Sequence, residues 1–249
     1  MMKGRLLQAL AWTVLALSAP PAAGQEVDAP ETARLVQDLL AAQGGMQAWE
    51  ESVAVEFDHV MFTPAVYAEG DTHWWASREV IEHGTLRAYA EWPIDGARLA
   101  HDGREVWSVG WKRPNAPDGM ARIHYFLVFL PWLTQQDDAR LTAGSPASLP
   151  GQEVESLVVD VAFGEGEPPF ALFIDPDTHR LRGFRNRGSL HVIHRFGDAD
   201  GLSIPIDWTT YLNGNVIGHH SVYHASLLDH FDESLLEAPP GAVRGSGAG

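Results

Sequence analysis

Short β-rich runs dominate the chain from residue 53 to residue 227, and turn signals separate them every 8 to 12 residues. We expect about eleven strands, at residues 53–57, 72–82, 85–92, 97–100, 104–109, 153–163, 170–175, 180–187, 190–196, 203–212 and 216–227. The pair Asn213-Gly214 is the strongest hairpin signal, because both residues tolerate the positive φ angles of a two-residue turn. Strands joined by such short turns run antiparallel, so the pattern predicts one meandering antiparallel sheet.

Two helical segments precede the expected sheet. Residues 30–43 carry apolar side chains at one-turn spacing, and Gly44-Gly45 follows as a C-terminal cap. Residues 46–51 are expected to add a short second helical turn.

A third segment, residues 121–133, is apolar on nearly every side. Its length favours a buried helix over a buried strand, and Pro131 predicts a kink in it. A helix that is apolar all round must be covered on more than one side. A two-layer sandwich would leave the helices unplaced. We therefore expect a mainly β protein of the α+β class, a curved antiparallel half-barrel sheet with helices covering its concave side.

The first residues have the pattern of a secretory signal peptide. Lys3 and Arg5 precede an apolar run of about 12 residues, which is too short to span a bilayer, and small residues follow up to a predicted cleavage site near Gly24. We expect residues 1–24 to be this signal peptide, residues 25–238 to form a single domain, and residues 239–249 to be a disordered tail. The exported protein is expected to be soluble in the periplasm if the host has two membranes.

Composition excludes several classes of protein. The chain has 17 basic and 33 acidic residues, a formal net charge of −16, which argues against binding to nucleic acid or to an anionic membrane surface. It has no cysteine, which excludes disulfides, thiol catalysis and cysteine-based metal sites. No HExxH, GxSxG or phosphate-loop motif occurs, so no catalytic residue, metal ligand or cofactor site is indicated.

Tryptophan and histidine supply the remaining candidates. Several tryptophans lie in expected strands, where they either fill a core or line an apolar cavity. His191 and His194 are expected on opposite faces of one strand. His220 and His224 are expected on one face of another, but about 13 Å apart, too far for joint metal ligation.

Four motifs occur in order along the chain: LLAAQGGMQAW at residues 39–49, DGREVW at 102–107, FLPW at 129–132 and IDPDTHRL at 174–181. As an ordered set they resemble a family of exported bacterial proteins related to the LolA/LolB-type lipoprotein carriers. The resemblance implies an antiparallel half-barrel of about eleven strands, helices that plug its open side, and acyl chains held in an apolar cavity beneath them.

The leading hypothesis is a non-enzymatic periplasmic protein that holds a lipid, a lipoprotein acyl chain or a similar apolar ligand beneath a lid formed by residues 121–133. Its expected partners are an apolar small molecule, a lipid or an acylated protein, with no cofactor, no nucleic acid and no stable membrane insertion. The expected lining residues are Trp75, Trp92, Trp107, Phe126, Phe129, Leu130 and Trp132.

Two alternatives stay open. One is a hydrolase or metal-dependent enzyme, which would bring at least three histidines and a carboxylate together in one pocket. The histidines in question are His59, His83, His191, His220 and His224. The other is a non-catalytic structural or interaction module of the cell envelope, whose core would leave no pocket large enough for an acyl chain.

Overall fold

The computed structural model describes residues 29–64, 74–85, 87–111, 127–163, 169–186 and 188–246. Its strands are β1 (Ala54–Phe62), β2 (Trp74–Glu82), β3 (Arg87–Trp92), β4 (Ala97–Asp102), β5 (Glu105–Val109), β6 (Ala139–Ala147), β7 (Ser156–Phe163), β8 (Phe170–Ile174), β9 (Leu181–Asn186), β10 (Ser189–Ala199), β11 (Leu202–Leu212), β12 (Asn215–Leu228) and β13 (Val243–Ser246). Its helices are α1 (Ala29–Ala42), α2 (Gln47–Glu51), residues 127–133 and the 3-10 helix η2 (Glu233–Leu236). The described chain is therefore mainly β with few helices, as the sequence predicts.

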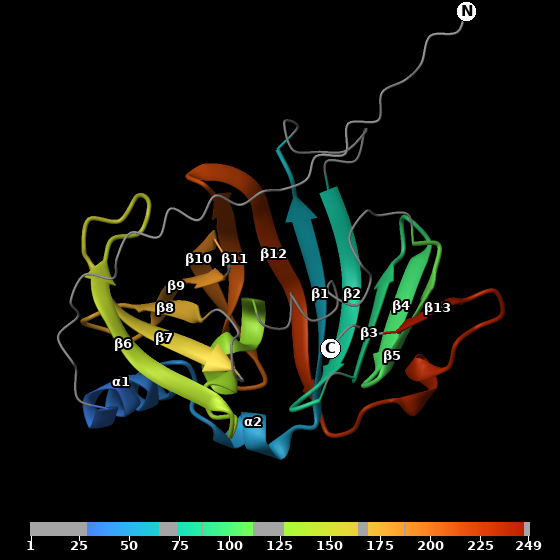
Figure 1. The fold of residues 1–249 in the computed structure, drawn as a ribbon, viewed down its shortest axis with the longest axis horizontal. Coiled ribbons are helices and arrows are strands. Elements are labelled where there is room, and N and C mark those ends of the chain that lie inside the picture. The colour runs from blue at the N-terminus through green and yellow to red at the C-terminus, as the bar shows by residue number, and fades with distance from the viewer. Residues whose placement is uncertain are drawn as a thin grey trace, which may run out of the picture.

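Within the described residues, thirteen strands form one antiparallel sheet in the order β13-β5-β4-β3-β2-β1-β12-β11-β10-β9-β8-β7-β6. Strands that follow one another in the chain are neighbours in the sheet, except that β1 pairs with β12 and β13 pairs with β5. Two meanders, β1–β5 and β6–β12, thus meet at the pair formed by β1 and β12. The sheet stays open, with β13 and β6 at its edges, and Figure 1 shows it bent around residues 127–133. The predicted curved antiparallel sheet with helices on its concave side is confirmed.

The two strands that the sequence does not predict are the two edge strands. β6 carries Gly144 and Pro146, which suit an edge better than a central strand, and its pairing with β7 shifts between Gly144 and Ala147. β13 lies in the segment expected to be a disordered tail, but residues 243–246 pair with residues 105–108 of β5. The expectation of disorder is wrong for this stretch, because an open sheet edge offers backbone hydrogen-bond partners to almost any added strand.

The helices α1 and α2 confirm the two helical segments expected before the sheet. Gly44 follows α1 with a φ of +104°, a conformation that favours glycine. A side chain at Gly44 would also clash with the backbone oxygen of Gly201, and the amide of Ser203 donates to the carbonyl oxygen of Gln43 at 2.9 Å. The end of α1 is therefore held against the turn between β10 and β11.

The lid segment is described only in part. Residues 127–133 are helical and all are buried, whereas residues 121–126 lie outside the described residues. The helix packs with α1 and with one face of both meanders in a single apolar core, which we call the concave cluster. Its members include Leu39, Phe57, Trp92, Phe184 and Trp208. This packing explains why the helix is apolar all round.

The opposite face of the sheet carries smaller apolar clusters. One of them surrounds Trp107 and is covered by η2 and the chain that leads to β13. The indole Nε1 of Trp107 donates to the carbonyl oxygen of Leu236 at 2.7 Å. Figure 1 shows this C-terminal segment outside β4 and β5, so Tyr89, Ala100 and Trp107 are covered on this face.

Candidate ligand site

Aromatic side chains anchor the helix of residues 127–133 at the α2 end of the concave cluster. The ring of Phe129 lies 5.8 Å from that of Trp49, 6.1 Å from that of Phe57 and 6.1 Å from that of Trp132. The indole Nε1 of Trp132 donates to the carbonyl oxygen of Gly45 at 2.9 Å. The helix is thereby tied to β1, to α2 and to the glycine pair that follows α1.

Most of the expected lining residues come together in this core. Trp92, Phe129, Leu130 and Trp132 are almost fully buried members of the concave cluster, and Trp75 packs against the cluster at intermediate exposure. These side chains pack against one another and against the sheet.

The other two expected lining residues are not found in the concave cluster. Trp107 lies on the opposite face with Tyr89 and Ala100, because its position in β5 gives it the other side of the pleat. The expectation that Trp107 lines the same apolar site as Trp92 and Phe129 is therefore wrong. Phe126 lies outside the described residues.

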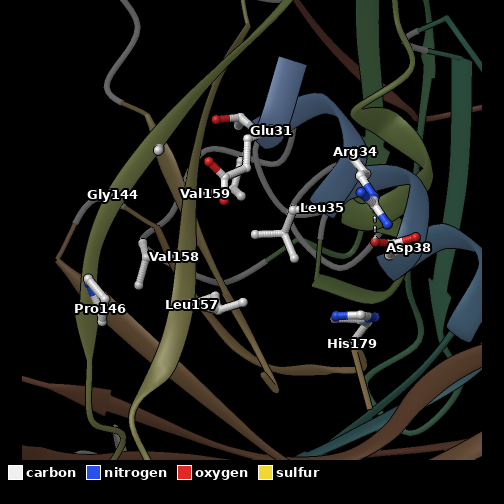
Figure 2. Close-up of a pocket in the computed structure, with 12 residues that line it drawn as sticks. Glu31, Arg34, Leu35, Asp38, Gly144, Pro146, Leu157, Val158, Val159 and His179 are labelled. Atoms are coloured by element: carbon white, nitrogen blue, oxygen red, sulfur yellow. Dashed lines mark ion pairs between the residues drawn. The ribbon is translucent and has the colours of Figure 1, made fainter. Parts of the chain in front are cut away.

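A cavity of about 460 Å³ opens between α1 and the strands β6 and β7 (Figure 2). Leu35 of α1 and Leu157 and Val159 of β7 supply apolar walls. Val159 is a member of the concave cluster, and the two leucines pack against it, so the cavity borders the apolar core. Its volume falls within the range of about 300–1,000 Å³ that is usual for small-molecule sites.

Charged side chains lie at the rim of this cavity. Nε of Arg34 lies 3.9 Å from Oδ2 of Asp38 one turn later in α1, and Figure 2 shows this ion pair beside the cavity. Glu31 and His179 also line it. The cavity thus has apolar walls next to the core and charged side chains where it opens.

The irregularity of β6 shapes the other wall. A Cβ placed on Gly144 would lie only 2.6 Å from Cγ1 of Val158, so the two strands approach closely here. The register then shifts before Ala147, and Pro146 lines the cavity. Sequence reasoning missed this cavity because it missed β6. The signal that was available is the triplet Gly-Ser-Pro within an otherwise strand-like stretch.

A row of buried histidines lies on the concave face of the sheet. Nε2 of His59 lies 3.0 Å from Nδ1 of His220, and the ring of His191 lies 6.5 Å from that of His220. Trp208 stacks on His59 and on His220 with ring separations of 5.8 and 4.9 Å. The four residues come from β1, β10, β11 and β12, so no sequence motif joins them.

His224 does not share a face with His220, contrary to the strand pattern. The pairing of β1 with β12 shifts so that Asp58 lies opposite His224 while His59 lies opposite Val222. The extra residue forms a bulge that turns the following side chains over, and His224 is exposed.

Burial keeps two of the candidate histidines uncharged. Desolvation lowers the pKa of His191 to about 3 and that of His83 to about 4. The ring of His83 lies 3.7 Å from that of Trp49, tilted by 35°, at the α2 end of the sheet and apart from the histidine row. Among the described residues, no group of three or more His, Cys, Asp or Glu side chains could hold a metal ion. The arrangement that would favour a metal-dependent enzyme is therefore not met in this part of the chain.

No helix in the described ranges is long and apolar enough to cross a membrane.

An open antiparallel sheet bent around buried helices defines the LolA-like fold class. Two solved structures share it with this chain: a LolA superfamily protein from Nitrosomonas europaea and a DUF1329 family protein from Desulfovibrio piger. Each has a TM-score of 0.51 and 10% sequence identity, over 83% of this chain and 97% of its own. The resemblance seen in the sequence is thus confirmed at the level of fold, and at this identity the likeness extends to the fold alone. No family model and no curated protein matches the sequence.

Proposed function

We propose that the protein is a periplasmic carrier that binds a lipid, a lipoprotein acyl chain or a similar apolar ligand and performs no covalent chemistry. The observation that carries this proposal is the cavity of about 460 Å³ whose apolar walls border the concave cluster. A fold shared with a LolA superfamily protein supports it. A module with a completely filled core would have no need of such a cavity.

The energy of binding comes from burial of the acyl chain. Each buried methylene contributes about 0.8 kcal/mol, so a dozen contribute on the order of 10 kcal/mol before the costs of association and ordering. In this proposal the chain enters between α1 and β7 and extends into the concave cluster as the helix of residues 127–133 shifts. Trp75, Trp92, Phe129, Leu130 and Trp132 then become its lining.

Export is supported by the pattern of residues 1–24, and the ligand is best identified in the same preparation. Native mass spectrometry of protein purified from its own periplasm should give the mass of a chain that begins near Gln25. Organic extraction should release a bound lipid or acylated peptide. Recovery of only the uncleaved chain in the cytoplasm would contradict the proposed location.

Filling the cavity provides a direct test of the site. Ala143 lines the cavity from β6, so the substitution Ala143→Trp should occupy it. We expect the affinity for a dansyl-labelled fatty acid, measured by fluorescence titration, to fall about tenfold or more, which corresponds to about 1.4 kcal/mol.

Thr142→Trp is the matched control, because Thr142 is the exposed neighbour on the same strand and its side chain points to the other side. This variant should bind the probe as the unchanged protein does. Equal binding by both variants would remove the cavity from the proposal.

A further inference from the structure

The histidine row lies next to the place where the helix of residues 127–133 contacts the sheet. Phe57 of β1 packs against Phe129, and His59, two residues further along the same face, begins the row. Two residues along a strand span about 7 Å. The concave face therefore changes from apolar at Phe57 to polar at His59, next to the contact between Phe57 and Phe129.

Trp208 stands at the centre of this row and is fully buried. Within the part of the chain that the structure describes, its indole Nε1 has no hydrogen-bond acceptor. The corresponding atoms of Trp107 and Trp132 each donate to a backbone carbonyl oxygen. A buried donor without an acceptor is unfavourable, and such a group in a native protein calls for a partner such as a ligand or an ordered water molecule.

The surroundings of Trp208 suit an uncharged acceptor. Burial keeps the pKa of His191 at about 3, so this ring is neutral at physiological pH. No lysine or arginine is buried among the described residues, and Glu79 is buried on the same face, where its carboxyl accepts a hydrogen bond from Ser77 at 2.6 Å. Among the described residues, a carboxylate placed here would meet no buried lysine or arginine, and burying an unpaired charge costs far more than burying a carbonyl group.

Glycine at position 218 makes room for the row. A Cβ on Gly218 would lie 3.0 Å from Nε2 of His220 and 2.8 Å from Cε of Met61. A side chain at position 218 would require the end of Met61 and the imidazole of His220 to shift. Glycine at position 218 therefore leaves space beside the imidazole of His220.

We infer that Trp208, together with the His59–His220 pair, is the specificity-determining polar end of the ligand site and that its indole N–H binds the uncharged carbonyl oxygen of an acyl ester or amide. This inference rests on the proposed carrier function. The acyl chain runs from this point along the concave cluster past Phe57 and Phe129. A free fatty acid, which is charged at neutral pH, is the disfavoured ligand.

The test compares two ligands of equal chain length, a monoacylglycerol and the free fatty acid, by displacement of a dansyl-labelled probe. The unchanged protein should bind the ester at least about tenfold more tightly, a difference of about 1.4 kcal/mol. In Trp208→Phe the ester should lose that advantage while binding of the acid changes little.

Trp132→Phe is the matched control. Trp132 is as deeply buried as Trp208, but its Nε1 already bonds the carbonyl oxygen of Gly45. This variant should weaken both ligands by a similar factor and keep the ratio of their dissociation constants. A change in that ratio equal to the one in Trp208→Phe would overturn the role of the indole N–H.

If Trp208→Phe does not fold, a measurement on the unchanged protein tests the inference instead. The infrared carbonyl stretch of a carbon-13 labelled ester should shift to lower frequency on binding, as expected for a carbonyl that accepts hydrogen bonds in the site. A stretch at the frequency seen in an apolar solvent would overturn the inference. Equal affinity for ester and acid would overturn it and leave the carrier proposal standing, whereas binding of neither ligand would overturn both.

Discussion

His83 and His191 are buried with pKa values of about 4 and about 3, well below the ordinary value of 6.5. Below about pH 6.5 the unfolded chain therefore binds more protons at these positions than the folded protein does. The free energy of unfolding should fall as the pH is lowered from about 6.5 towards 4, by on the order of 1 kcal/mol per pH unit for each histidine. Urea unfolding at a series of pH values measures this slope.

The contribution of His191 can be isolated by His191→Phe. The phenyl ring keeps the stacking on Phe184, which lies 4.4 Å away, but leaves the hydroxyl of Thr210 without its histidine partner. We expect lower stability at every pH and a slope that is smaller by about 1 kcal/mol per pH unit between about pH 6 and 5. Above about pH 7 the two curves should run parallel. Equal slopes at acid pH would mean that His191 is protonated in the folded protein.

Individual side chains also show where sequence reasoning ends. The burial of Trp92, Phe129 and Trp132 could be predicted, since large apolar residues in regular runs are seldom left in water. The face of Trp107 could not, because alternation gives relative faces within one strand and only the pairing between strands gives the side of the sheet. Trp208 and its histidine neighbours lie on four different strands, so their proximity could not be predicted from the sequence.

The C-terminal segment makes a testable contribution at the scale of elements. η2 and the chain up to Ala242 cover Trp107, and β13 pairs with the edge of β5. Deleting residues 238–249 should lower the free energy of unfolding by about 1–3 kcal/mol and, by exposing the β5 edge, promote self-association. Thermal unfolding and analytical ultracentrifugation measure the two effects. Deleting only residues 247–249 is the control and should change neither.

Some secondary-structure elements could be predicted from the sequence, and others could not. α1, α2 and the central strands carry periodic apolar patterns and turn residues that act locally, so their positions follow from the sequence. β6 contains Gly144 and Pro146, and β13 is short and glycine-bearing. Both strands form because a neighbouring strand presents unpaired backbone groups. Their formation depends on the tertiary structure and not on a local sequence pattern.

The whole molecule should unfold as one unit. The concave cluster joins α1, residues 127–133 and strands from both meanders, and β1 pairs with β12 along nine residue positions. Neither meander has a separate apolar core on this face among the described residues. We expect far-UV circular dichroism and tryptophan fluorescence to give coincident urea transitions. Two separated transitions would show that the meanders fold independently.

Local sequence patterns were sufficient to predict the fold class of this protein. Alternating apolar residues, Gly- and Asn-rich turns and one helix that is apolar all round determined an antiparallel sheet bent around buried helices. The tertiary structure alone decided the pairing of β1 with β12, the cavity between α1 and β6–β7, and the row from His59 to His191. These features depend on register and bulges between strands far apart in the chain, and a shift of one residue turns a side chain to the other face.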